Sequence, residues 1–263
     1  MQTLTISPNL EVTLYDSIEE FPVHIELEAR QYATMQSGLA TSQEELEEKK
    51  ERIDLLERYD RKGDLYKEQS NYRIAEHLLS INFMPLELEW CCYVYAINGG
   101  RVVGHRENAL IERLDHLKEN GLTSNQIAES LNQLKAEMEA EVKRLYPGRI
   151  EKGKKWNNLT RYKAYGEAMV DHFIDPNEET KRKLDKAIID ILSTQEVLDF
   201  GGENDVLSQL KTAQFAMYAI LTECGVADPK SITLFEYYGW IDVLQKRHEA
   251  QKPTPTPHAP KRQ

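Results

Sequence analysis

The pattern that most constrains this chain is a series of amphipathic helices that follow one another from Pro22 to Ala250 with short connections. In each of them apolar residues recur at helical spacing, and charged or polar residues fill the positions between. Proline, glycine and capping residues separate the helices. The pattern predicts a mainly α-helical protein. We expect helices at residues 22–36, 43–61, 64–82, 85–97, 106–119, 123–145, 159–174, 177–192, 204–224 and 232–250.

A short β element is expected before these helices. The segment LEVTLY at residues 10–15 alternates in character and contains β-branched residues, which is typical of a strand. The segment RVVGH at residues 101–105 is expected to form a second strand that pairs with it.

The helix expected at residues 85–97 is apolar on every side from Trp90 onward, as a helix at the centre of a core should be. We therefore expect Trp90, Cys91 and Val94 to be buried. Two other helices carry one long apolar stripe each. These stripes consist of Ile127, Leu131, Leu134, Met138, Val142 and Leu145 in the first helix, and Tyr162, Tyr165, Met169 and Phe173 in the second.

The glycine-containing, basic stretch EKGKKWNN at residues 151–158 is the best candidate for a domain boundary. It predicts an acidic helical subdomain at 1–150 and a four-helix subdomain at 151–250. Residues 251–263 then form a Pro/Thr-rich tail that is expected to be extended or disordered on its own. We expect the basic tip of the tail, Lys261 and Arg262, to bind an acidic partner, for which the first half of a neighbouring copy is one candidate.

Charge is distributed unevenly along the chain. Residues 1–150 contain 27 acidic and 17 basic residues, a net charge of −10, whereas 151–263 has a net charge of −1. An acidic surface repels phosphate, so we expect no nucleic-acid partner. No apolar run approaches the ~18 residues of a membrane span, and no signal peptide is visible at the N-terminus. We therefore expect no secretion, and we expect three buried, reduced cysteines: Cys91, Cys92 and Cys224.

Residue types that carry out catalysis do not converge in the sequence. The seven histidines are scattered, and none stands at zinc-ligand spacing. The nearest approach to a metal-binding set is Glu167, Asp171 and His172, but the chain lacks the pair of Glu-x-x-His helices that a di-iron bundle needs. We therefore expect no catalytic residue, metal, cofactor or small-molecule substrate.

An aromatic cluster, FEYYGW, lies in the last expected helix. Phe235, Tyr238 and Trp240 do not all fall on the face formed by Leu234, Tyr237, Ile241 and Leu244. A helix that is apolar on more than one side is covered on more than one side. The second cover comes either from this chain or from a partner, and we consider Phe235, Tyr238 and Trp240 possible partner-binding residues.

Two stretches resemble proteins of tailed phages. VTLYDSIEEFPVHIELEARQYATMQSGL, a charged helix, PLELEWCCYVYAINGG and a helix ending in KRLYP together resemble helical proteins encoded among the virion genes of tailed phages of gut bacteria, over roughly residues 10–150. The stretch SITLFEYYGWIDVLQKR is similar to the last helix of small phage tail-assembly chaperones. This resemblance implies a virion component or an assembly factor, whose partners are other phage structural proteins or copies of itself.

Three hypotheses about function follow. The first is a non-enzymatic structural or assembly protein of a tailed-phage particle. The second is a cytosolic helical adaptor or regulatory protein that binds a single protein partner through an acidic surface. The third, which the residues favour least, is an enzyme with a carboxylate site on the later helices.

Overall fold

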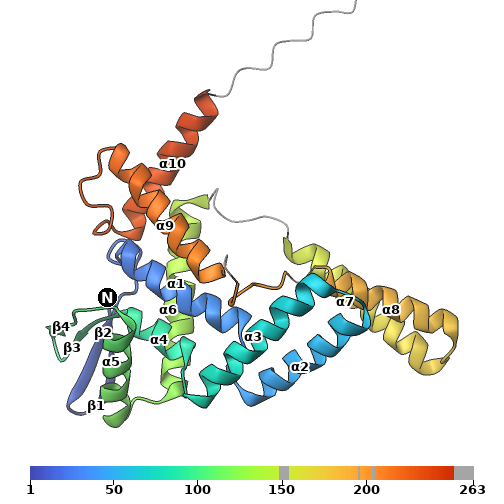
Figure 1. Cartoon of the computed structure of the whole chain (residues 1–263). Coiled ribbons are helices and arrows are strands. Elements are labelled where there is room, and N and C mark those ends of the chain that lie inside the picture. The colour runs from blue at the N-terminus through green and yellow to red at the C-terminus, as the bar shows by residue number, and fades with distance from the viewer. Residues whose placement is uncertain (148–153, 195, 203–204, 252–263) are drawn as a thin grey trace, which may run out of the picture.

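The computed structural model describes residues 1–147, 154–194, 196–202 and 205–251. Ten helices and four short strands lie in these ranges, so the expectation of a mainly helical chain with a small N-terminal β element is confirmed (Figure 1). The tail at 252–263, including Lys261 and Arg262, lies outside the described residues. The elements are β1 (Gln2–Ser7), β2 (Leu10–Leu14), α1 (Val23–Gly38), α2 (Gln43–Arg58), α3 (Lys62–Ser80), α4 (Pro85–Cys92), β3 (Val94–Ile97), β4 (Gly100–Arg101), α5 (Glu107–Glu119), α6 (Ser124–Leu145), α7 (Lys154–Ile174), α8 (Glu178–Leu192), α9 (Val206–Glu223) and α10 (Leu234–Gln251).

The four strands form one antiparallel sheet in the order β1-β2-β3-β4. Alternation on β2 buries Leu10, Val12 and Leu14 on one face, as the pattern LEVTLY predicts. The expected strand at 101–105 is wrong, because β4 covers Gly100–Arg101 and pairs with β3 instead of β2. The strand β3 lies between β2 and β4 in the sheet, because β3 and β4 form a hairpin. The sequence analysis also missed β1, which pairs with β2.

The expected helix at residues 85–97 is wrong in its second half. The helix α4 ends at Cys92, and Val94–Ile97 is the strand β3. A continuous apolar run is compatible with a helix or with a strand. Here the hairpin turn that follows the run determines that its second half is a strand. Asn98 and Gly99 both have positive φ, 49° and 76°, as a tight two-residue hairpin turn requires. The expected burial is nevertheless confirmed, since Trp90, Cys91 and Val94 are fully buried.

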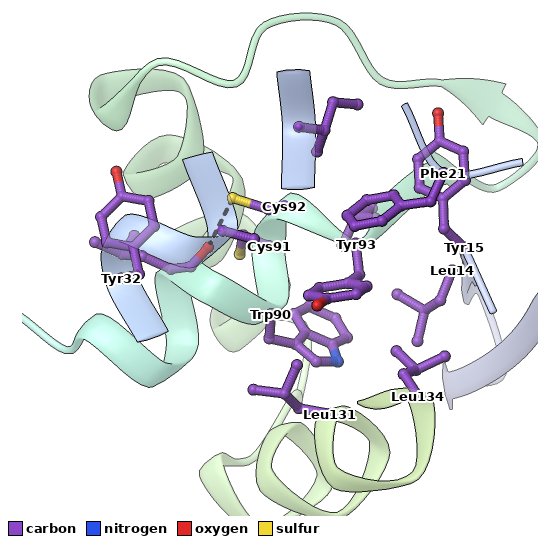
Figure 2. Packing of buried hydrophobic residues seen from close by; sticks show 14 of the residues in the cluster. Leu14, Tyr15, Phe21, Tyr32, Trp90, Cys91, Cys92, Tyr93, Leu131 and Leu134 are labelled. Carbon is purple, nitrogen blue, oxygen red and sulfur yellow. Dashed lines mark hydrogen bonds between the residues drawn. The ribbon is translucent and has the colours of Figure 1, made fainter. Parts of the chain in front are cut away.

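The main core lies where α1, α4, α6 and the sheet meet. Figure 2 shows the Trp90 ring between Tyr93 and the α6 residues Leu131 and Leu134. The indole N–H of Trp90 donates to Ser130 Oγ at 2.8 Å, so the polar edge of the ring is satisfied inside the core. The first four residues of the predicted α6 stripe are buried, and the last two are partly buried against the same core.

Two buried glutamates on α4 fix its position against α5 and α6. Glu87 accepts from Lys118 Nζ at 2.6 Å and from Ser124 Oγ at 2.7 Å. Glu89 pairs with Lys135 Nζ at 2.6 Å, and burial raises the pKa of its carboxyl group. Because buried carboxylates are costly unless paired, these contacts specify how the helices sit around α4.

The helices α9 and α10, from the C-terminal part of the chain, pack against the main core. The amide of Leu234 donates to Phe21 O, and the amide of Phe235 donates to Ile18 O, each at 2.9 Å. The amide of Val23 in turn donates to Ile232 O. The start of α10 is therefore tied by backbone hydrogen bonds to the turn that precedes α1.

The helices α2 and α3 form an antiparallel hairpin with a small apolar core of its own, built from Leu39, Ala40, Leu46 and Ala75. The segment between α8 and α9 crosses this hairpin, where Asn71 Nδ2 donates to Leu198 O at 2.6 Å. The helices α7 and α8 pack on each other and lie near α2 and α3, whereas α9 and α10 lie beside α1 (Figure 1). The division at residue 150 falls within 148–153, outside the described residues, and the domain boundaries stay a prediction.

Candidate protein-interaction surfaces

The hairpin of α7 and α8 is held at its turn by side chains that bind the backbone. Asn177 caps α8 by accepting from the amides of Glu179 and Thr180, and the Thr180 hydroxyl lies 3.0 Å from His172 Nδ1. The turn also contains Asp175, whose carbonyl accepts from the Thr180 hydroxyl at 2.7 Å. The His172 side chain therefore contacts the turn between α7 and α8. The expected lack of a metal at Glu167, Asp171 and His172 stays a prediction.

One face of α7 near this turn exposes a run of large apolar side chains. The exposed fractions are 47% for Met169, 52% for Val170, 88% for Phe173 and 74% for Ile174. Their spacing of one, three and four residues places them side by side on the helix. We call these four residues the α7 patch. The sequence stripe on this helix includes Met169 and Phe173, but the described part of the chain leaves about half of Met169 and most of Phe173 exposed.

A groove of about 730 Å³ lies between the α2–α3 hairpin and the α7–α8 hairpin. Its apolar lining comes from both hairpins and the segment after α8, and two tyrosines of α7 contribute to it. Five glutamates and two basic residues also line it. The apolar and aromatic lining residues include Leu39, Leu55, Tyr162, Tyr165, Ile188, Ile191, Leu192, Val197 and Leu198; the charged ones are Glu45, Glu48, Lys49, Glu51, Arg52, Glu68 and Glu196.

The charged centre of the groove is Glu68 on α3, which is 3% exposed. Its carboxylate lies 3.1 Å from Lys49 Nζ and 3.5 Å from Arg52 Nε, both on α2. The two cations of the groove thus neutralise the buried carboxylate. Glu48 and Glu51 on α2 and Glu196 after α8 stand at the exposed rim, so the rim is acidic.

Hydrogen bonds fix the distance between the two hairpins. The Tyr59 hydroxyl donates to Asp185 Oδ1 at 2.5 Å, and Arg61 Nη1 donates to Ser193 Oγ at 2.8 Å. Burial, together with the hydrogen bond to Asp185, raises the pKa of Tyr59 to about 12, so this hydroxyl stays protonated at neutral pH. With the Asn71–Leu198 bond, these hydrogen bonds connect the two hairpins across the groove.

The predicted partner-binding aromatic residues of α10 have different environments. Tyr238 packs on the main core, with its ring 5.5 Å from that of Tyr146, the residue that follows α6. Phe235 is 39% exposed, its ring lies 6.0 Å from that of Tyr146, and its carbonyl accepts from the Tyr146 hydroxyl. Trp240 is half-buried. Tyr146 of this chain therefore covers part of the second apolar side of α10. Partner binding by Phe235, Tyr238 and Trp240 stays a prediction.

The sequence analysis did not single out Glu68 and Asn71, which the structure buries at the groove. Glu68 pairs with Lys49 and Arg52 on α2, whereas Asn71 bonds the segment after α8 and accepts from the amide of Phe200 through Oδ1 at 3.2 Å. With Ala75 they follow helical spacing on α3, so two polar residues interrupt an otherwise apolar stripe. That interruption is the signal that would have identified them.

The cysteine prediction is partly wrong. Cys91 and Cys92 are buried free thiols, and burial raises the pKa of the Cys91 thiol to about 12. Cys224, in contrast, is half-buried and is the C-cap residue of α9. All three are reduced, and the high pKa of Cys91 leaves it without nucleophilic character at neutral pH.

Within the described ranges no group of three or more His, Cys, Asp or Glu residues is arranged to hold a metal ion. Across the same residues, no helix is long and apolar enough to cross a membrane. Comparison with models of known families, with curated proteins and with solved structures finds no match to this chain.

Proposed function

We propose that this chain is a non-enzymatic structural or assembly protein of a tailed-phage particle, either a minor virion component or a tail-assembly factor. It acts by protein–protein contacts with other phage structural proteins or with copies of itself, in the virion or in the host cytoplasm. The resemblance of residues 10–150 to phage virion-gene proteins supports the biological setting.

The observation that carries this proposal is the α7 patch. Four large apolar side chains gather at the tip of a helical hairpin that projects from the rest of the molecule (Figure 1). Large apolar surfaces that remain exposed on a folded chain mark sites of contact with other proteins, and phenylalanine and methionine are enriched at interface cores. A projecting hairpin brings this patch to a partner without requiring the main core to open.

The test is the size of the purified full chain, alone and co-expressed with the products of the neighbouring genes. Light scattering should detect an assembly larger than one chain, and mass spectrometry should find the chain in purified particles or in assembly intermediates. The double variant Phe173→Ser/Ile174→Ser should shift the assembly to smaller species while circular dichroism stays unchanged.

A matched control is Val103→Ser, which removes an equally exposed apolar side chain, 84% exposed, from the segment between β4 and α5. It should assemble as the parent does. If the parent chain is a monomer alone and with every neighbour, and is absent from particles and intermediates, the proposal fails.

The acidic rim of the groove favours a second candidate, the adaptor that binds a single protein partner through an acidic surface. Stoichiometry separates the two candidates, because an adaptor forms a complex of one fixed composition and does not enter particles. A one-to-one complex with a single basic partner would favour the adaptor.

A further inference from the structure

We propose that the groove between the α2–α3 and α7–α8 hairpins binds the proline-rich tail, residues 252–263, of a second copy of this chain. This inference rests on the proposed function, because it supplies a copy-to-copy contact for an assembling protein. It assigns a location to the acidic partner that the sequence predicts for the tail. The α7 patch and the groove are separate surfaces, so each can be tested alone.

Charge complementarity is the first argument. The groove carries five glutamates against Lys49 and Arg52, and those two cations face the buried carboxylate of Glu68. The tail carries three basic residues, Lys252, Lys261 and Arg262, and no acidic residue. Opposite charge on two surfaces favours their encounter and sets their register.

Side-chain chemistry is the second argument. The tail contains four prolines, and the run PHAPKR places Pro257 three residues before Pro260, which Lys261 and Arg262 follow directly. Proline-rich segments with this spacing favour the polyproline II conformation, and such segments dock in grooves lined by aromatic rings. Tyr162 and Tyr165 supply rings to this groove, and Glu48, Glu51 and Glu196 stand at its rim for the basic tip.

Chain length is the third argument, and it selects a second copy over the same chain. The helix α10 begins at the N-terminal end of α1, whereas the groove is lined by the C-terminal end of α1 at residues 36–40. Those two ends are about 24 Å apart at 1.5 Å per residue. The helix α10 then runs about 27 Å further, and Figure 1 shows it leading away from α2 and α3.

A tail of 12 residues spans at most about 40 Å when fully extended. The route back along α10 and α1 is about 51 Å long, which is longer than the tail, so the tail does not reach its own groove along these helices. A neighbouring molecule can place its tail there without that restriction. The tail and groove of adjacent copies therefore form a head-to-tail contact, which can repeat along a row of molecules.

The test uses full-length chains and charge reversal on both sides of the contact. A fluorescent peptide of residues 252–263 is titrated with the full chain carrying Lys261→Ala/Arg262→Ala, whose uncharged tail tip competes neither for the acidic groove nor for a basic one. Adding Glu48→Lys/Glu51→Lys at the groove rim should weaken peptide binding about tenfold or more. The matched control is Glu47→Lys/Asp54→Lys, which makes the same charge change at exposed positions of α2 outside the groove and should leave binding within about twofold.

Aromatic recognition is tested separately. Tyr162→Ala should weaken peptide binding about tenfold, and Tyr66→Ala, which removes an exposed ring of α3 outside the groove, should not weaken it. Equal binding by parent, groove and control variants would overturn the proposal, as would unaltered binding by Tyr162→Ala.

The choice of a second copy is tested by mixing. In chains that also carry Phe173→Ser/Ile174→Ser, so that the α7 patch does not contribute, the groove variant Glu48→Lys/Glu51→Lys and the tail variant Lys261→Glu/Arg262→Glu should each lose the remaining self-association by light scattering. An equimolar mixture should regain it, because the acidic tail of one fits the basic groove of the other. A parent chain that stays monomeric while its own tail excludes the peptide would show intramolecular binding and overturn this assignment. If the chain assembles through the α7 patch and ignores groove and tail variants, this inference fails and the proposed function stands.

Discussion

The helices α6 and α7 carry apolar stripes of similar spacing, but they end in opposite environments. On α6, Ile127, Leu131 and Leu134 are at most 1% exposed, whereas on α7, Met169 and Phe173 are 47% and 88% exposed. The helix α6 lies against α4 and the sheet, while α7 has α8 as its principal neighbour. An apolar stripe therefore predicts that a helix has a face to bury, and the surrounding chain decides whether that face is buried within the monomer.

The largest expected effect on stability comes from truncating a side chain at the centre of the buried core. Trp90→Ala should lower the free energy of unfolding by about 3–5 kcal/mol, because it leaves a cavity at the centre of the core and removes the partner of Ser130. Thermal unfolding should show a decrease in Tm of about 10 °C. A Tm within a degree or two of the parent would contradict the central position of Trp90.

A matched pair tests the comparison directly. Leu131→Ala on α6 should lower the free energy of unfolding by about 2–5 kcal/mol, because Leu131 is fully buried. Met169→Ala on α7 should change it by less than about 1 kcal/mol in the isolated monomer. Urea unfolding of both variants at low concentration measures the difference. Equal destabilisation would mean that the α7 patch is covered in the free chain.

Two helical glycines give a smaller contrast. A methyl group on Gly38 of α1 would lie 2.5 Å from the Phe200 ring, so Gly38→Ala should destabilise by about 1–3 kcal/mol. A Cβ on Gly166 of α7 meets nothing within 4 Å, so Gly166→Ala should stabilise by about 0.5–1 kcal/mol through helix propensity. Urea midpoints measure both effects. If Gly38→Ala in a Phe200→Ala background is still destabilising, the steric explanation is wrong.

The smallest effect concerns pH. Burial, and then the nearby charge of Arg113, lower the pKa of His105 from 6.5 to about 4. The unfolded chain binds the proton first, so the stability contributed by neutral His105 is lost as pH falls from about 6.5 toward about 4. His105→Asn should make urea midpoints less dependent on pH between about 7 and about 5. Parallel pH profiles for parent and variant would contradict this environment for His105.

Helix positions could be predicted from the sequence because spacing, caps and breakers are local properties. The tight hairpin turn at Asn98-Gly99 was not recognised, so the apolar run before it was assigned to a helix when half of it is strand. The groove could not be predicted, since it arises where the α2–α3 and α7–α8 hairpins meet, far apart in the sequence. Glu68 pairs with Lys49 on another helix, and Asn71 bonds Leu198 more than a hundred positions later. Neither contact could be predicted from the sequence around α3.

The backbone hydrogen bonds that tie the start of α10 to the turn before α1 have a consequence for synthesis. A ribosome that adds 5–20 residues per second makes residue 234 roughly 10–40 s after residue 21. During that interval the turn before α1 lacks its final partner, and β2 waits for β3 through the synthesis of about eighty residues. The nascent chain therefore completes its core last, when its C-terminal helices leave the ribosome. Premature termination before α10 should yield a product that is prone to aggregation and degradation.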